Sequence, residues 1–374
     1  MVNFVICEFN PFHNGHQYLL EKIGQYPTVC IMSGHITQRG SFAFTDKWTR
    51  ARMALTGGAD LVLELPAAAA AGSAMDFARG AMEVAEATGF EGRLCFGTEG
   101  DVVRKLGALA RLPEATVAEQ IKPYLKEGLS PAAALMRLYT AYLPDAVEIL
   151  GKPNNLLAFE YLKANKKFSV LSVGRQGSAH DSDEPSGRFA SASYLRAHPD
   201  HYRDYMPENI HALFRQAVHS GRFLDPARAA LLMTAALRDI PAQKWEQMYP
   251  GGMGARLYKA LCEQTELSAA ADAAKTKCFT HAAVRRALLS AYLGGRQTAK
   301  TQFIRVLGMN DRGRALLGEM KPSLPVLIKP AKISQLGEEA RQQFLFDCLI
   351  TDRFTFMWRA PQKKGLEYSS PVIL

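Results

Sequence analysis

The sequence predicts an α/β fold: a Rossmann-like, doubly wound parallel sheet followed by a mainly α-helical C-terminal domain. In the first half of the 374 residues, short apolar runs alternate with segments of helical periodicity, which is typical of parallel strands joined by crossover helices. In the second half, apolar residues recur at helical spacing between Pro and Gly residues. This change of character predicts two domains, residues 1–196 and 197–374.

Five short, continuous apolar runs are predicted as buried parallel strands. They cover residues 2–7, 28–33, 60–65, 93–98 and 168–173. Segments with helical periodicity separate them, at 15–24, 47–56, 74–88 and across 115–165. After residue 196, helices are predicted over 207–221, 226–239, 251–264 and 280–294, and the tail 353–361 is expected to add a strand or a closing segment.

The composition argues against several classes of protein. No apolar run approaches the roughly 20 residues that are needed to span a bilayer, and the first residues lack the basic leader of a secretory signal. The six cysteines are scattered without a CxxC pair, which argues against a zinc site and against a disulfide framework. We therefore expect a cytoplasmic protein without a membrane partner and without a metal site of its own.

The charge is distributed unevenly along the chain. Residues 1–196 contain 20 Lys or Arg and 20 Asp or Glu side chains, whereas residues 197–374 contain 25 and 16. The net charge of +9 thus lies entirely in the second half. Such an asymmetry favours a polyanionic partner, in particular a nucleic acid, for that half. The alternative is a basic surface that only keeps the protein soluble.

The stretch CEFNPFHNGH, residues 7–16, lies where the first strand ends and the first helix begins. In open α/β sheets, ligands bind beyond the carboxyl ends of the strands. The Gly-rich dinucleotide and P-loop fingerprints are absent, and H-x-G-H remains, formed by His13, Asn14, Gly15 and His16. Gly15 permits a tight turn, the helix start offers N–H groups to a phosphate, and the imidazoles can stabilise departing pyrophosphate.

A second segment, FASASYLR at 189–196, follows the fifth predicted strand and a loop. Ser191 and Ser193 can cap a helix and donate to phosphates, and Arg196 lies one turn later. Simpler explanations exist for both segments: two histidines near a turn can be incidental, and Ser is a common helix cap. A metal site is disfavoured, because no third ligand has a fixed spacing to the two histidines.

These residues together resemble the H-x-G-H nucleotidyltransferase superfamily. The wider sequence is similar to the bacterial tRNA(Met) cytidine acetate ligase family over essentially its whole length. The resemblance is carried by EFNPFHNGH, MSGHITQRG, DKWTRARMAL, GADLVLELP, CFGTEGD, KPNNLLAFEYLKA and TKCFTHAAVRRALL…FIRVLGMNDRGRALL, in the family's order. It implies an enzyme that uses ATP to activate acetate as acetyl-adenylate. The acetyl group is then transferred to the exocyclic amine of the wobble cytidine of elongator tRNA(Met), and AMP and pyrophosphate are released.

The resemblance also implies an ATP site, in which His13, His16, Ser191, Ser193 and Arg196 carry the chemistry. The resemblance does not decide whether Asn154 or Asn155 contacts ATP. The chemistry of ATP implies that Mg²⁺ is present to neutralise the phosphates. Thr98 stands where the family pattern has Ser, which keeps the hydroxyl, and Ala158 stands where it has Gly. The ATP-binding positions that carry over are Cys7, Glu8, Phe9, Asn10, Pro11, Phe12, His13, Asn14, Gly15, His16, Gln17, Tyr18, Leu19, Leu20, Gly97, Asn154, Asn155 and Arg175.

Acetate is small and anionic, so it needs a short cationic pocket near the α-phosphate. The segment SGHITQRG…FTDKW supplies His35, Arg39 and Lys47, and we expect one or more of them to hold acetate. The alternative for Lys47 is an ordinary solvated set of ion pairs at a helix start, formed with Asp46 and Arg50.

The basic second half is predicted to bind tRNA through its backbone phosphates. The alternative is that these side chains form the normal solvated face of a helix. The wobble base must be presented out of its stack, against an aromatic side chain that the sequence does not identify. The predicted contacts are Lys275, Lys277, Arg285, Arg286, Arg305, Arg312 and Arg314.

Two other functions fit part of the sequence. An adenylyltransferase that makes a small cofactor explains H-x-G-H, but it leaves the large basic second half without a purpose. A non-catalytic RNA-binding protein explains the charge, but it gives no reason for the intact His13, His16, Ser191, Ser193 and Arg196. An aminoacyl-tRNA synthetase is disfavoured, because a K-M-S-K-S-like loop is absent.

Overall fold

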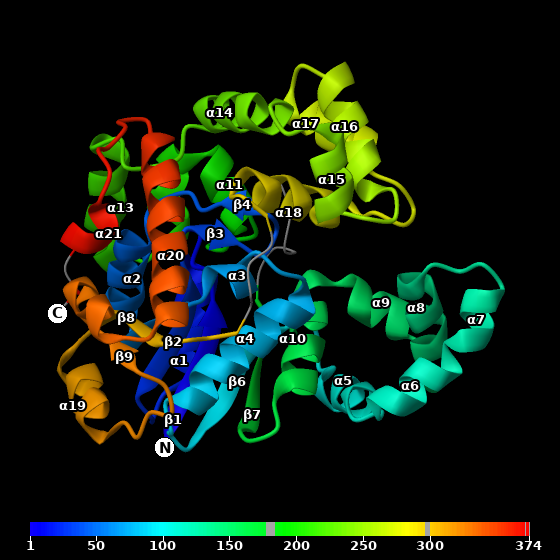
Figure 1. Ribbon diagram of the computed structural model, residues 1–374. Coiled ribbons are helices and arrows are strands. Elements are labelled where there is room, and N and C mark those ends of the chain that lie inside the picture. Colours follow the sequence, from blue (N-terminus) through cyan, green and yellow to red (C-terminus); the bar gives the residue numbers. More distant parts are fainter. Residues whose placement is uncertain (177–183, 296–299, 371, 374) are drawn as a thin grey trace.

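A computed structural model of the protein describes residues 1–176, 184–295, 300–370 and 372–373. A seven-stranded sheet forms its centre, with the strand order β7-β6-β1-β2-β5-β8-β9 (Figure 1). Every neighbouring pair is parallel except β5 and β8, which are antiparallel. The strands are β1 (Val2–Cys7), β2 (Thr28–Ser33), β5 (Leu61–Leu65), β6 (Gly92–Thr98), β7 (Ser169–Gly174), β8 (Ile304–Met309) and β9 (Val326–Leu327). A separate hairpin pairs β3 (Ile36–Thr37) with β4 (Ser41–Phe42).

Both faces of the sheet are covered, as the continuous apolar runs require. Alternate side chains of β1 belong to different hydrophobic clusters, Phe4 to one and Val5 and Cys7 to the other. Helices α4 (Ala74–Ala87) and α10 (Pro153–Ala164) pack on the first face. The second face is covered by α1 (Asn14–Ile23), α2 (Lys47–Thr56) and α13 (Glu208–His219).

Two groups of helices project from the sheet layers (Figure 1). The insertion lobe lies between β6 and β7 and consists of α5 (Val103–Ala110), α6 (Glu114–Gln120), α7 (Lys122–Lys126), α8 (Pro131–Tyr142) and α9 (Ala146–Gly151). The helical lobe consists of α14 (Pro226–Arg238), α15 (Ala242–Met248), α16 (Met253–Glu263), α17 (Leu267–Ala274) and α18 (His281–Tyr292). It has a hydrophobic cluster that includes Trp245, Leu257 and Leu288.

The remaining helices are short or close the fold near the C-terminus. Helix α20 is the longest described helix, with 19 residues. These helices are α3 (Ala67–Ala70), α11 (Ala192–Ala197), α12 (Tyr202–Tyr205), α19 (Asp311–Glu319), α20 (Glu338–Phe356) and α21 (Leu366–Ser369), with 3-10 turns at Pro199–His201 and Pro330–Gln335.

The predicted fold class is confirmed, including all five predicted strands. Strands β8 and β9 were not predicted, and they bring the second half of the chain into the sheet of the first half. A boundary at residue 196 therefore does not separate the strands of the sheet from a purely helical second part of the chain. Residues 353–361 were expected to add a strand or a closing segment. The strand is wrong, because α20 continues to Phe356 and only Trp358 of this segment forms an isolated bridge, with Leu224.

Within the described residues, no helix is both long enough and apolar enough to cross a bilayer.

Candidate active site

A cavity of about 290 Å³ opens at the carboxyl ends of β1, β6 and β7. This is the edge of the sheet where ligands of open α/β folds bind, and β1 is the point at which the strand order reverses direction. The starts of α1, α10 and α11 and the β3–β4 hairpin complete its walls. Predicted site residues in the lining are Cys7, Glu8, Phe9, Asn10, His13, Gly15, His16, Tyr18, Leu19, Arg39, Gly97, Asn154, Arg175, Ser191, Ser193 and Arg196.

The two histidines form the N-terminal cap of α1. Nδ1 of His13 accepts the amide of Gly15 at 3.1 Å, and Nδ1 of His16 accepts the amide of His13 at 3.2 Å. The rings stack with their centroids 3.7 Å apart. Because each Nδ1 accepts a hydrogen bond, the proton of each neutral ring is on Nε2, which can donate to a ligand.

The backbone of this loop is held tightly. A Cβ on Gly15 would lie 2.9 Å from Cε1 of His13, so only glycine leaves room for the cap. Phe9 has a φ of 45°, a left-handed conformation that is unfavourable for an aromatic residue. The Phe9 ring lies edge-on to His16, with the centroids 4.9 Å apart, and thereby fixes the ring of His16.

Ser191, Ser193 and Arg196 meet the histidines at the cavity. Ser191 caps α11 by accepting the amide of Tyr194 at 3.0 Å, and its hydroxyl lies 2.9 Å from that of Ser193. Nη1 of Arg196 donates to the carbonyl of Asn10 at 2.8 Å, which ties α11 to the loop after β1. The sequence segments 7–16 and 189–196 are thus brought to one cavity, as the resemblance predicts.

The ends of β6 and β7 form the opposite wall. A Cβ on Gly97 would lie 3.3 Å from Cγ of Arg175, so glycine allows this close approach. Nη1 of Arg175 donates to Oδ1 of Asn154 at 3.2 Å, and Nδ2 of Asn154 donates to Glu99 at 2.6 Å. Burial lowers the pKa of Arg175, and the nearby Glu99 opposes that shift.

The structure distinguishes the two candidate asparagines. Asn154 lines the cavity, whereas Asn155 is fully buried behind it. The Asn155 side chain accepts the amide of Glu99 at 2.8 Å and donates to the carbonyl of Glu99 at 3.1 Å. Asn155 therefore fixes the loop after β6, and Asn154 is the residue placed to meet a ligand.

Some predicted ATP-binding positions do not line the cavity. Phe12 and Leu20 are buried in the hydrophobic cluster under α1. Asn14 donates to the carbonyl of Arg188 at 2.8 Å, and Gln17 donates to Glu21 at 3.1 Å. Side-chain contacts from these positions to ATP are not supported by the geometry. The positions concerned are Pro11, Phe12, Asn14, Gln17, Asn155 and Leu20.

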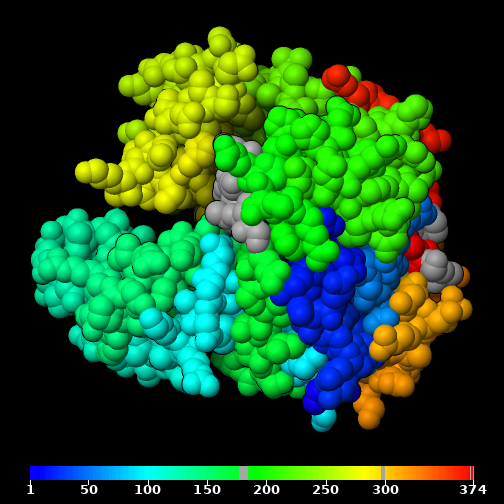
Figure 2. All heavy atoms as spheres, turned by 180° about the vertical axis from the view of Figure 1, so that it is seen from behind, coloured from blue at the N-terminus to red at the C-terminus, as the bar shows by residue number. Residues whose placement is uncertain are grey.

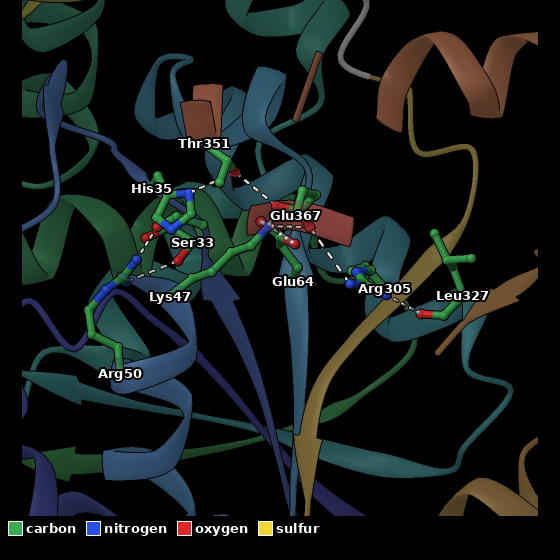
Figure 3. Close-up of polar contacts among 10 residues, drawn as sticks. Ser33, His35, Lys47, Arg50, Glu64, Arg305, Leu327, Thr351 and Glu367 are labelled. Carbon is green, nitrogen blue, oxygen red and sulfur yellow. Dashed lines mark hydrogen bonds and ion pairs between the residues drawn. The ribbon is translucent and has the colours of Figure 1, made fainter. Parts of the chain in front are cut away.

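Of the three residues among which one or more were expected to hold acetate, two do not reach the cavity. Lys47 is buried, with its Nζ 2.8 Å from both carboxylate oxygens of Glu64 and 3.0 Å from Glu367 (Figure 3). His35 is also buried, and its Nδ1 lies 3.1 Å from the hydroxyl of Thr351. Neither side chain lines the cavity, because both face a buried polar cluster instead. This cluster consists of His35, Lys47, Glu64, Arg305, Thr351 and Glu367. Only Arg39, in the β3–β4 hairpin, lies on the cavity wall.

The alternative that Lys47 belongs to a solvated set of ion pairs is also wrong. Asp46, Lys47 and Arg50 are each at most 1% exposed. The Arg50 guanidinium donates to the carbonyls of Glu8 and Ser33, at 2.6 and 3.0 Å, and to that of Gly34. Arg50 thus joins the ends of β1 and β2 beside the cavity, a role that no pattern in the sequence indicates.

The basic residues predicted to bind tRNA are dispersed. Arg305 is 3% exposed in β8, where it donates to the carbonyls of Leu327 and Ile328 at 3.3 and 2.9 Å (Figure 3). Its predicted contact with tRNA is wrong, because its guanidinium is enclosed by protein. Arg312 and Arg314 are exposed on α19. Helix α19 follows β8, whose end pairs with the start of β5, so it lies at the edge of the sheet opposite the cavity.

Two of the other four basic residues, Arg285 and Arg286, lie on α18 next to the β3–β4 hairpin. A Cβ on Gly40 would lie 2.5 Å from the amide of Arg286, so the hairpin packs directly on the backbone of α18. Burial lowers the pKa of Arg285, and the positive charge of Arg39 adds to that shift. Lys275 and Lys277 are exposed between α17 and α18. Figure 2 shows the surface hollowed between the helical lobe in yellow and the insertion lobe in teal.

The fold and this cavity define a nucleotide-binding enzyme of the H-x-G-H class. A family model described as HIGH Nucleotidyl Transferase matches residues 2–368. The chain belongs to this family.

The resemblance to the tRNA(Met) cytidine acetate ligases is confirmed as well. The chain is 32% identical to the tRNA(Met) cytidine acetate ligase of Thermoanaerobacter sp. (strain X514), covering 99% of this chain and 98% of that protein. It is 30% identical to the protein of that name from Acetivibrio thermocellus, covering 99% of each.

Solved structures agree with the sequence relatives. The crystal structure of Thermotoga maritima TmcAL bound with alpha-thio ATP superposes with a TM-score of 0.90 and 26% identity, covering all of this chain and 98% of that one. The same protein without ligand gives a TM-score of 0.92, also at 26% identity.

Proposed function

We propose that the protein is an ATP-dependent ligase that acetylates the wobble cytidine of elongator tRNA(Met). The observation that carries this proposal is the pair of stacked histidines at the carboxyl end of β1, facing Ser191, Ser193 and Arg196 across one cavity. Relatives that are named for this reaction cover nearly the whole chain. The substrate class then places the enzyme in the cytoplasm.

The first step is the activation of acetate. An acetate oxygen attacks the α-phosphorus of ATP, and the bond from that phosphorus to the bridging oxygen of pyrophosphate breaks. His13 and His16 donate from Nε2 to the phosphates, and the hydroxyls of Ser191 and Ser193 and the guanidinium of Arg196 hold the departing charge. Because the caps fix these donors before ATP arrives, little rearrangement is needed in the transition state.

ATP brings Mg²⁺ to this site. Glu8 is the one carboxylate among the described residues of the cavity lining, and a single carboxylate is too small a donor set for a dedicated protein site. We therefore propose that the ATP phosphates carry the Mg²⁺, which neutralises part of their charge.

Arg39 is the candidate for the acetate contact. It is the one predicted acetate ligand on the cavity wall, and it lies on the hairpin that approaches the end of β1. Arg39→Lys, which keeps a charge, and Arg39→Ala, which removes it, form a matched pair. We expect Arg39→Ala to raise the acetate concentration needed for half-maximal pyrophosphate release. An unchanged acetate dependence would exclude Arg39.

The second step is acetyl transfer. The cytidine amine attacks the carbonyl carbon of acetyl-adenylate, the bond from that carbon to the phosphate oxygen breaks, and AMP leaves. We propose that Lys275, Lys277, Arg285 and Arg286, which lie on or just before α18, hold the tRNA backbone, because α18 packs on the hairpin that lines the cavity. The rival small-cofactor adenylyltransferase needs none of them.

The experiment uses unmodified elongator tRNA(Met) with ATP, Mg²⁺ and ¹⁴C-acetate. We expect the label to enter the tRNA, and mass spectrometry of its nucleosides to give one acetylated cytidine. A transcript with uridine at the wobble position is the matched control and should take up no label. Equal labelling of both transcripts, or of neither, would contradict the proposed substrate.

A further inference from the structure

Glu8 lies at the junction between the first strand and the β3–β4 hairpin. Its Oε1 accepts the backbone amide of Gln38 at 2.7 Å, and its carbonyl accepts from Arg50 at 2.6 Å. Main chain and side chain are therefore both held in place, and Oε2 can accept from a ligand. Among the described residues of the cavity lining, no other side chain is a carboxylate.

The chemistry of the transfer step requires a proton acceptor. When an amine attacks an acyl carbon, its nitrogen acquires a positive charge and must lose a proton. The other polar groups of the lining are mostly donors: the arginines, the hydroxyls, and the histidines whose Nδ1 atoms are occupied by amides. Among the described residues of the lining, Glu8 is the one side chain that is acceptor-only when ionised.

We propose that the Glu8 carboxylate receives the wobble cytidine and acts as general base in acetyl transfer. This inference rests on the proposed function and adds a residue to its second step. The exocyclic amine of the flipped cytosine donates one hydrogen to Oε2. As the nitrogen attacks the acetyl carbon and the carbon–oxygen bond to AMP breaks, that proton passes to Glu8, and the carboxylic acid later releases it to solvent.

The same contact selects the base. Cytosine presents an N–H₂ donor at position 4, whereas uracil presents a carbonyl oxygen there. A carboxylate accepts from the first and is repelled by the second. Thr37, Gln38 and Ser41 of the hairpin also line the cavity, and they supply donors for the remaining acceptor atoms of cytosine.

The surroundings of Glu8 suit a group that must exchange a proton. Burial raises its pKa, while the Gln38 amide and the charges of Arg50, Arg196 and Arg39 lower it, and the net direction is upward. Cys7 and Tyr161 also face it, and burial raises the pKa of both, so they stay neutral. A carboxyl with a raised pKa is a stronger base than an ordinary one.

The test measures the two steps separately in Glu8→Gln. The amide keeps the size of the side chain and its bond from Gln38 but cannot take a proton. Acetate-dependent exchange of pyrophosphate into ATP reports the first step, and transfer of ¹⁴C-acetate to tRNA(Met) under single turnover reports the second. We expect transfer to fall by about 100-fold or more, and exchange to fall far less. Glu86→Gln, on the exposed side of α4, is the matched control and should change neither.

The pH dependence adds a signature that a structural role would not produce. The base must be ionised, so the transfer rate of the unaltered protein should rise as the pH increases through the pKa of Glu8, and this rise should be missing in Glu8→Gln. Equal losses in exchange and transfer would overturn the proposal and make Glu8 a counter-ion of the arginines. If the unaltered protein shows no acetate-dependent exchange at all, the proposed function falls and this role falls with it.

Discussion

His13 combines a structural contact with a chemical one, and substitutions can separate the two. Its Nδ1 caps α1, while its ring lies against His16 on the cavity wall. An N-cap is worth about 1 kcal/mol, and a preorganised donor to a transition state is worth about 100- to 1,000-fold in rate.

We predict that His13→Asn separates these contributions. Asn is a good N-cap, so the free energy of unfolding should stay within about 0.5 kcal/mol of that of the unaltered protein, while acetate-dependent pyrophosphate exchange falls by about 100-fold or more. His13→Ala should lose both. Denaturant titration and the exchange assay check the pair, and an active His13→Asn would show that the ring has no role in catalysis.

His35 gives a prediction for the pH dependence of stability. Burial, with smaller contributions from Lys47 and Arg50, lowers its pKa well below the ordinary value, so the folded protein keeps it neutral. The unfolded chain takes up a proton below about pH 6.5, and stability should therefore decrease as the pH falls through that value. In His35→Phe, the dependence of the unfolding free energy on pH that comes from His35 should be missing. The measurement compares the slope of unfolding free energy against pH between pH 7 and 5 in the two proteins, because a change in packing alone shifts the free energy by the same amount at every pH. Identical slopes would contradict a neutral, buried His35.

Among the elements, α21 is connected to the sheet mainly through charge. Glu367 of α21 lies within 2.9 Å of Lys47 in α2 and 3.7 Å of Arg305 in β8, and it also accepts from Thr351 of α20 at 2.8 Å (Figure 3). All of these groups are buried. The end of the chain thus closes over helices and strands that are far apart in sequence, next to the loop in which Gly34 and His35 follow β2.

We predict that Lys47→Met destabilises the fold by about 3–5 kcal/mol, because it leaves Glu64 and Glu367 buried without their shared cation. The matched control is Lys259→Met, which removes an exposed lysine that is 3.8 Å from Glu263, and it should change stability by less than about 0.5 kcal/mol. Chemical denaturation measures both. A Lys47→Met protein as stable as the control would show that the cluster does not hold the C-terminal helix.

In the whole molecule, both lobes join elements that line the cavity. The insertion lobe leads into α10, whose start carries Asn154, and the helical lobe meets the hairpin that carries Arg39. A tRNA that presents its wobble base to the cavity would approach the carboxyl edge of the sheet, whereas α19 lies at the opposite edge.

This arrangement predicts the salt dependence of tRNA binding. The logarithm of affinity should fall linearly with the logarithm of salt concentration, and Lys275→Ala and Lys277→Ala should each reduce the slope by about 1. Arg312→Ala is the control on the opposite edge and should leave the slope unchanged. Filter binding across a salt series distinguishes the cases, and a larger effect of Arg312→Ala would place the tRNA on the other side of the molecule.

The sequence predicted the parts of the fold and the site that depend on local pattern. The strands at 2–7 and 28–33 are continuous apolar runs, and H-x-G-H is a contiguous motif whose cap geometry follows from its own residues. It could not predict that β8 inserts antiparallel beside β5, because that pairing joins residues about 240 apart. For the same reason the sequence did not show that Lys47 and Arg305 are each buried against Glu367. Lys47 was expected to hold acetate or to join a solvated set of ion pairs, and Arg305 was expected to contact tRNA.

The decisive experiment measures the release of pyrophosphate from ATP, with and without acetate, and then after unmodified tRNA(Met) is added. We predict that acetate is required for release, and that tRNA then receives the acetyl group and allows repeated turnover. Release that ignores acetate but responds to a phosphorylated metabolite would contradict the account and favour a small-cofactor adenylyltransferase.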